Sequence, residues 1–90
     1  MQDIYKFSKS KMIKELAKLV KTKRLNLNKS ITLLSDEIEM TKSMWADLEK
    51  GKKDPQLSTI WRICQGLEIP LSDFIKELEI ELGKEFSLID

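Results

Sequence analysis

The side chains best placed for chemistry belong to residues 41–50 (TKSMWADLEK), a segment that is predicted to hold one short helix. At 100° per residue, Lys42, Ser43 and Asp47 point away from the apolar residues of the same segment. Lysine can donate to guanine O6 and N7, serine can pair with several bases, and aspartate can accept from cytosine N4. Ala46 could contact a thymine methyl group. This face therefore has the groups that read base edges, or it is the ordinary solvated face of a small helix.

Three lysines follow this face. Lys50 ends the predicted helix, and Lys52 and Lys53 lie in the loop after it. From there they could contact DNA phosphates, although a solubilising lysine cluster is the alternative. Asp47 opposes DNA binding, because a carboxylate that faces phosphates is repelled unless it meets a cytosine or a lysine.

Catalytic and metal chemistry is not expected. The 90 residues include no His and one Cys, and no glycine-rich phosphate loop is present. The sequence therefore cannot form a histidine-based acid–base pair, a cysteine-based zinc site or an intrachain disulfide. We expect neither an enzyme nor a bound cofactor or metal. Cys64 shares an inward helix face with aliphatic residues, which favours a core thiol over a sensor.

The first predicted helix begins at Ser8 or Ser10 and runs to about Lys23, followed by a turn over residues 24–29. Ser30 then caps a second helix. The inward positions of these two helices, at i, i+3, i+4 spacing, are Met12, Ile13, Leu16, Leu19, Val20, Leu33, Leu34 and Ile38.

A joint at residues 39–40 leads into the third helix, for which Thr41 is the expected N-cap and a further candidate for base contact. Thr41 and Met44 are expected inward with Trp45 and Leu48. Gly51 stops this helix. The fourth and fifth helices are predicted over about 57–66 and from Pro70 onward, with inward residues Leu57, Ile60, Trp61, Ile63, Cys64, Leu67, Leu71, Phe74, Ile75, Leu78 and Leu82.

Composition indicates one all-α domain. The chain is 41% apolar and 34% charged, with three Gly and two Pro, which leaves little room for turn-rich β architecture. We expect a compact five-helix bundle over residues 1–90, with its core at about 12–75 and a C-terminal extension at 76–90. The apolar runs are shorter than the roughly 20 residues of a membrane span, and the charged start does not resemble a signal peptide. A cytoplasmic protein is expected.

Charge is distributed unevenly along the chain. Residues 1–29 hold nine Lys or Arg against two acidic residues, a balance of +7, whereas residues 76–90 hold two against five, a balance of −3. This pattern predicts a directional electric field around the molecule. Solvated helix faces are the alternative.

The segment after residue 75 carries more apolar residues than a five-helix monomer obviously needs. We consider it a candidate homodimer seam, with residues 85–90 (EFSLID) as a possible intermolecular strand; packing of this tail onto its own domain is the alternative. A two-fold dimer would suit two-fold symmetric DNA sites. The seam residues are Leu78, Ile80, Leu82, Phe86, Leu88 and Ile89.

Residues 34–55 resemble the Cro/C1-type (XRE-like) helix-turn-helix family. The key positions in register are Leu34, Ile38, Met40, Thr41, Trp45, Leu48, Glu49, Gly51 and Pro55, and the later helices match at Ile60, Ile63, Cys64, Leu67, Ile69 and Phe74. The resemblance covers about residues 12–75. It implies a lambda-repressor-like domain that binds double-stranded DNA by its third helix in the major groove, and a nucleoid-associated location.

Position by position, the resemblance places Lys42, Ser43 and Asp47 at the principal base-reading sites of the family, and Lys52 at a loop position that contacts the DNA backbone. The implied function is transcriptional regulation, with a dimeric repressor as the leading form. An antitoxin that binds its own promoter and a toxin partner is a close variant.

The resemblance also implies a structural ion pair. Arg24 and Glu49 match an Arg and a Glu that join the first and third helices in some members of the family. The Gln that often starts the second helix and contacts phosphate corresponds to Ile31 without a gap, or to Lys29 if two residues were inserted. Lys29 is therefore a further candidate for phosphate contact.

The sequence departs from the family at the turn. Glu39 replaces the usual Gly and is expected in a left-handed conformation at a cost of roughly 1 kcal/mol. Ser35 replaces a small Ala, and Asp36 and Glu37 add negative charge beside the turn. These acids favour the competing hypothesis, a protein-interaction module that has lost DNA binding.

Overall fold

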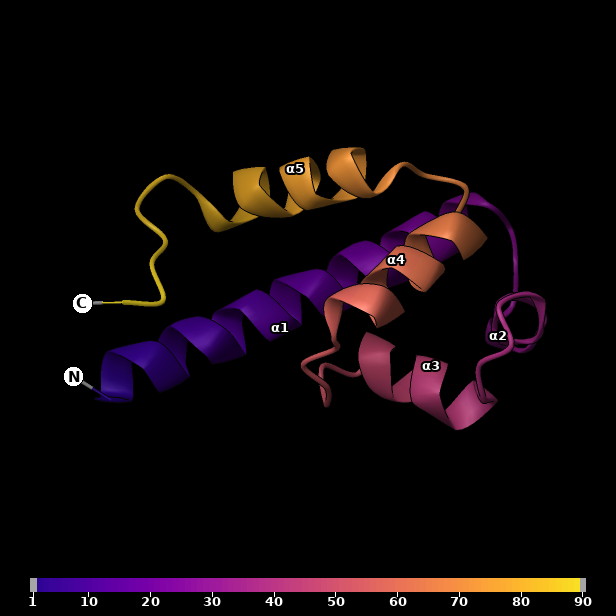
Figure 1. Ribbon diagram of the computed structural model, residues 1–90, viewed down its shortest axis with the longest axis horizontal. Coiled ribbons are helices and arrows are strands. Elements are labelled where there is room, and N and C mark those ends of the chain that lie inside the picture. Colours follow the sequence, from indigo (N-terminus) through magenta and orange to yellow (C-terminus); the bar gives the residue numbers. More distant parts are fainter. Residues whose placement is uncertain (1, 90) are drawn as a thin grey trace.

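The computed structural model describes residues 2–89, and these residues form five α-helices with no β-strand among them (Figure 1). The helices are α1 (Gln2–Asn26), α2 (Ile31–Glu37), α3 (Lys42–Glu49), α4 (Leu57–Gly66) and α5 (Leu71–Leu82). The predicted all-α, five-helix architecture is confirmed. Within the described residues, no helix combines the length and the apolar character that a membrane crossing requires.

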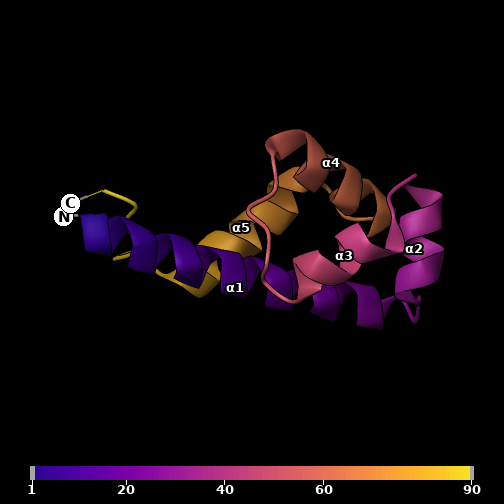
Figure 2. The same ribbon diagram turned by 90° about the horizontal axis from the view of Figure 1, so that it is seen from below.

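Helix α1 is longer than predicted at both ends. It begins at Gln2 rather than at Ser8 or Ser10, and it ends at Asn26 rather than at Lys23. The first ten residues contain neither Gly nor Pro, so nothing interrupts the helix, and the two serines lie inside it instead of capping it. Figure 2 shows the first turns of α1 extending beyond the other helices, where only the tail after α5 accompanies them.

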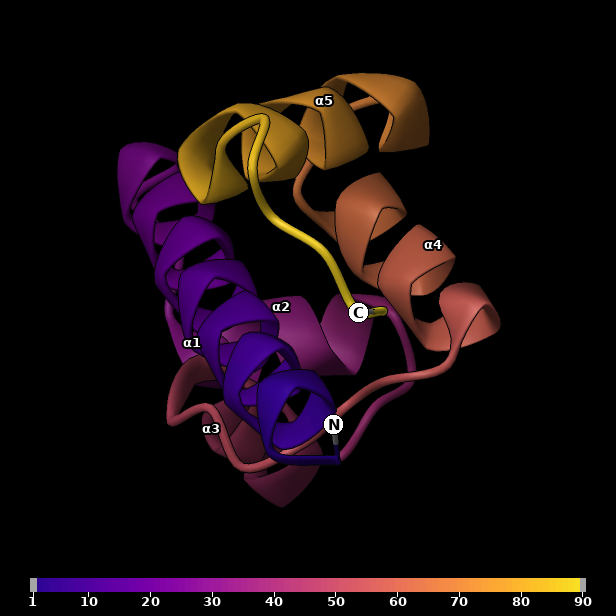
Figure 3. The ribbon, with the colours of Figure 1, turned by 90° about the vertical axis from the view of Figure 1, so that its left-hand side faces the viewer.

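The core lies where α1 passes between α3 and α5, which occupy opposite sides of the bundle (Figure 3). Trp45, Phe74 and Leu34 are completely buried at its centre. They come from α3, α5 and α2, so that one cluster joins three helices around α1. The other buried members of the cluster are Leu16, Val20, Met40, Leu48, Ile63, Cys64, Leu67, Leu78 and Leu82.

Four apolar residues that were predicted to face inward are exposed instead: Leu33, Met44, Leu57 and Trp61. Trp61 is 52% exposed, because α4 is buried through Ile63 and Cys64 and Trp61 lies on another side of the helix. Thr41 is likewise exposed. The short helices of this small bundle bury a narrower stripe than the sequence pattern indicated.

Two residues of the predicted dimer seam are buried within the single chain. Leu78 and Leu82 are 9% and 8% exposed and belong to the core of the single chain, because they continue the stripe of Phe74 at i, i+4 spacing. Phe86 is partly buried against the same cluster. The tail thus packs on its own domain at this point, whereas Ile80 remains 67% exposed.

Candidate nucleic-acid interface

The turn between α2 and α3 is closed by backbone hydrogen bonds. Glu39 has a φ of 55°, the left-handed conformation predicted for it. Its N–H donates to the Asp36 carbonyl at 3.2 Å, and the Met40 N–H donates to the Ser35 carbonyl at 2.8 Å. This pair of bonds is the Schellman motif that ends helices. Ser35 is buried, and its hydroxyl donates to the Thr32 carbonyl at 3.1 Å, so the serine leaves no polar atom unsatisfied.

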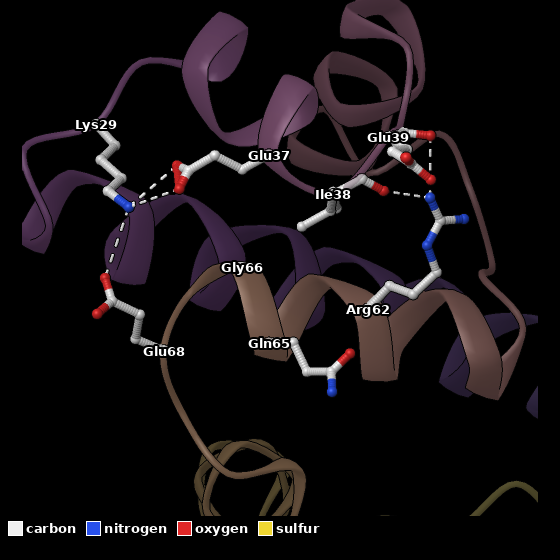
Figure 4. A pocket seen from close by; sticks show the side chains of 8 residues that line it. All are labelled: Lys29, Glu37, Ile38, Glu39, Arg62, Gln65, Gly66 and Glu68. Carbon is white, nitrogen blue, oxygen red and sulfur yellow. Dashed lines mark hydrogen bonds and ion pairs between the residues drawn. The ribbon is translucent and has the colours of Figure 1, made fainter.

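Arg62 of α4 stabilises the same turn through hydrogen bonds, as Figure 4 shows. Its guanidinium Nη2 donates to the carbonyl of Ile38 and, at 3.0 Å, to the carbonyl of Glu39. These carbonyls follow the end of α2, where backbone acceptors lack partners within the helix and a positive charge is favourable. Sequence reasoning missed Arg62, since a side chain that donates to backbone carbonyls leaves no pattern in the sequence.

A largely buried ion pair joins α3 to α1. Arg24 Nε and Nη2 donate to the two Glu49 carboxylate oxygens at 2.6 and 3.0 Å, and Nη1 donates to the Lys29 carbonyl at 3.0 Å. The hydrogen bond with Glu49 raises the pKa of Arg24. Trp45 Nε1 also donates to Glu49 Oε2, at 2.6 Å. The side chains of Arg24 and Glu49 are only 12% and 6% exposed, so this network fixes the orientation of α3.

The outer face of α3 begins directly after the turn. The Thr41 hydroxyl accepts a hydrogen bond from the Met44 N–H at 3.1 Å and so caps the helix. Thr41, Lys42 and Ser43 are exposed, whereas Ala46 is half-buried. Asp47, one helical turn after Ser43, is half-buried too. The five candidates for base contact therefore lie on one short helix, with its first turn open to solvent.

The lysines at the end of α3 are exposed. Gly51 adopts a φ of 72°, as predicted for a helix stop, and the Lys52 N–H donates to the Asp47 carbonyl at 3.0 Å. The chain therefore turns sharply, and Lys50, Lys52 and Lys53 all reach solvent beside the C-terminal end of α3.

Lys29 lies in a different setting. Its ammonium binds the two carboxylate oxygens of Glu37 at 3.0 and 3.1 Å, and Glu68 approaches to 3.6 Å. The hydrogen bond with Glu37 raises the pKa of Lys29. These three residues line a hollow of about 500 Å³ together with Glu39 and Arg62 (Figure 4). A phosphate would have to displace two carboxylates to reach Lys29.

Cys64 belongs to the core. It is 1% exposed, and burial raises the pKa of its thiol to about 11. Its sulfur is therefore protonated and shielded at neutral pH. In the part of the chain that the structure describes, no group of three His, Cys, Asp or Glu residues could hold a metal ion.

Comparison with known sequences supports the same architecture. The HTH_3 family model, described as "Helix-turn-helix", matches residues 20–74. A curated relative, the HTH-type transcriptional regulator SutR of Escherichia coli (strain K12), is 33% identical over 46 residues. That match covers 51% of this chain and 26% of SutR, so the chain spans about a quarter of the length of this relative.

Solved structures share the arrangement of the helices. An HTH_3 family transcriptional regulator from Vibrio cholerae superposes with a TM-score of 0.71 at 25% identity, and the match covers 77% of this chain and 39% of that one. A variant of the restriction–modification controller protein C.Esp1396I superposes with a TM-score of 0.74 at 18% identity, over 82% of this chain and 94% of that one. The second likeness concerns the fold alone.

Proposed function

Because the chain belongs to the HTH_3 helix-turn-helix family, of the Cro/C1 type, we propose that it is a sequence-specific DNA-binding transcriptional regulator. The main support for the proposal is the orientation of α3, which buries one face in the core and exposes the other to solvent. Trp45 and Leu48 anchor one side of the helix in the core, while Lys42 and Ser43 face solvent directly after the turn. In this arrangement, the first turn of α3 can enter the major groove of B-DNA.

Base recognition would fall to five residues of the outer face. Lys42 would donate to guanine O6 and N7, and Asp47 would accept from cytosine N4. The Ser43 hydroxyl could pair with a donor or an acceptor on a base edge. Thr41 adds a hydroxyl that can still donate, since its oxygen is the acceptor in the cap. Ala46 would contact a thymine methyl group.

Phosphate contacts would come from Lys50, Lys52 and Lys53, which are exposed where α3 ends. Lys29 is a weaker contributor in this proposal, because a phosphate must displace Glu37 and Glu68. The contacts to phosphate would fix the register of α3 in the groove, and the base contacts would supply the specificity.

A homodimer would place two copies of α3 on successive major grooves, about one helical turn apart. The accessible part of the proposed dimer seam is Ile80 and Ile89, which are exposed, with Phe86 and Leu88, which are half-buried; Leu78 and Leu82 would support the seam from the core. We propose repression as the regulatory sense, since a bound dimer excludes other proteins from the same duplex. The protein would then act on the nucleoid, in the cytoplasm.

A protein-interaction module is the second candidate. Asp36 and Glu39 are exposed beside the turn, and Asp47 lies on the outer face of α3, an acidic set that would repel phosphates and attract a basic partner. An antitoxin would combine both activities, binding its own promoter and a toxin protein.

A salt titration tests the proposal. Binding is measured to random duplex DNA and to the duplex upstream of the protein's own gene, at several salt concentrations. We expect tighter binding to the upstream duplex and an affinity that falls steeply with salt, because lysines displace counterions from phosphates. Absence of binding to either duplex at low salt would exclude the regulator and leave the protein-interaction module.

A further inference from the structure

The first turns of α1 carry a basic surface next to the loop that follows α3. Lys6, Lys9 and Lys14 line one shallow hollow of about 240 Å³, and Gly51, the residue that ends α3, lines its other side. Lys52 and Lys53 follow Gly51 immediately. The basic strip, defined here as Lys6, Lys9, Lys14, Lys52 and Lys53, thus joins two segments that are far apart in the sequence.

The juxtaposition is fixed by packing and by charge. A β-carbon placed on Gly51 would lie 3.9 Å from Ala17 Cβ and 4.0 Å from Ile13 Cγ2, so this flank of α1 lies directly against the loop. Lys9 Nζ lies 3.5 Å from Asp54 Oδ2, a contact between α1 and the far end of the same loop. Since α1 is a continuous helix from Gln2, these contacts also position the turns that project beyond the bundle.

The strip carries more positive charge than the described ion pairs neutralise. Of its five lysines, Lys9 alone pairs with a described carboxylate, that of Asp54, at 3.5 Å. Among the described side chains, Lys6, Lys14, Lys52 and Lys53 have no acidic partner within ion-pair distance. Glu15, which follows Lys14 in the sequence, pairs instead with Lys18 at 3.6 Å.

We propose that the α1 lysines of the basic strip extend the phosphate contacts of Lys52 and Lys53, so that the strip follows one DNA strand outward from the groove that α3 would occupy; the inference rests on the proposed DNA binding. Lys6 and Lys14 are eight residues apart and therefore about 12 Å apart along the helix. A DNA strand presents a phosphate about every 3.4 Å of its axis. The projecting part of α1 thus spans several phosphates that the helix-turn-helix alone does not reach.

Salt dependence of binding tests this surface directly. The variant carrying both Lys6→Gln and Lys14→Gln removes two exposed charges from the strip. Because each phosphate contact contributes about 0.9 to the slope of log K against log salt, we expect the slope for random duplex DNA to become shallower by about 1.8. Affinity at low salt should fall with it, while the preference for a specific duplex over random DNA stays the same.

The matched control carries Lys76→Gln and Lys84→Gln, which make the same change in net charge on α5 and directly after it, outside the basic strip. Its slope should equal that of the wild-type protein. A strip variant with the wild-type slope, while the wild-type protein binds DNA, overturns the inference and leaves the proposed function intact. Failure of the wild-type protein to bind any DNA overturns both.

Discussion

Glu49 connects three parts of the molecule at the residue scale. Its carboxylate accepts from Arg24 of α1 and from Trp45 of α3, and all three side chains lie away from solvent. Loss of the carboxylate would leave Nε and Nη2 of Arg24 and the Trp45 indole N–H without their acceptors, where unsatisfied polar groups are costly. Glu49 would therefore affect the proposed DNA binding through the orientation of α3, without contact with bases.

We expect Glu49→Ala to lower the free energy of unfolding by about 2 to 3 kcal/mol, somewhat less than removal of one partner of a fully buried ion pair does. Urea denaturation measures the effect. Glu79→Ala is the control, since Glu79 is exposed and should change stability by less than about 0.5 kcal/mol. An unfolding midpoint of Glu49→Ala equal to that of the wild-type protein would show that the ion pair does not stabilise the fold.

Glu39 carries strain in the backbone. At a φ of 55°, an L-residue with a β-carbon costs roughly 1 kcal/mol, which glycine avoids at some entropic cost. We expect Glu39→Gly to raise the free energy of unfolding by about 0.5 to 1 kcal/mol, measured by urea denaturation. Glu39→Ala removes the same charge without relieving the backbone, so equal stabilisation by both variants would assign the gain to charge instead.

The residue scale is also where the sequence was least informative. The helical spacing of the sequence placed Lys42, Ser43 and Asp47 on one face. The family resemblance paired Arg24 with Glu49, because that pair occurs in other members. Arg62 could not be found in this way, since its partners are backbone carbonyls. The pairing of Lys29 with Glu37 and Glu68 depends on how two loops meet, which no local pattern encodes.

At the scale of the elements, the end of α4 lies against Ile38, the residue that follows α2. Gly66 lies near the end of α4, and a β-carbon added there would be 2.7 Å from Ile38 Cγ2, closer than packed atoms tolerate. This glycine and the hydrogen bonds of Arg62 together hold the end of α2, and hence the turn that leads into α3.

We expect Gly66→Ala to destabilise the protein by about 1 to 3 kcal/mol through overpacking, although alanine is the better helix former. Thermal or urea denaturation gives the value. The Ile38→Ala background removes the opposing methyl group, so Gly66→Ala should cost less there. Equal costs in the two backgrounds would mean that the close approach does not limit stability.

The bounds of most elements followed from local signals. Ser30 and Thr41 cap α2 and α3, and Gly51 ends α3, because these residue types satisfy helix ends in a known way. The start of α1 was misjudged since a capping residue inside a helix resembles one at its end. Trp61 and Met44 were misassigned because the width of a buried stripe depends on the neighbouring helices, which the periodicity of one segment does not reveal.

At the scale of the whole molecule, α1 organises the assembly. It contacts both α5 and α3, and Lys23 Nζ pairs with Glu77 at 2.8 Å across the α1–α5 interface. The basic strip is formed by the first turns of α1 together with the loop that follows α3. Ile80 and Ile89, in contrast, belong to α5 and the tail, so the proposed dimer seam and the proposed DNA-binding surfaces are formed by different elements.

We expect the wild-type protein to sediment as a dimer and Ile80→Glu to sediment as a monomer, because a charge buried in an apolar seam is costly to desolvate. Analytical ultracentrifugation distinguishes the two states. Leu33→Glu, at an exposed position of α2, introduces the same charge elsewhere and should leave the dimer intact. A dimeric Ile80→Glu protein would place the seam on another surface.

Selection of duplexes from a random library, with the wild-type protein and with the variant carrying Lys42→Ala and Ser43→Ala, tests most directly whether α3 reads DNA. We expect the wild-type protein to enrich one short motif, and the variant to bind duplex DNA through its lysines while losing the bases that Lys42 and Ser43 specify. Enrichment of the same motif by both proteins, or of none by the wild-type protein, would contradict the assignment of α3 as the recognition helix.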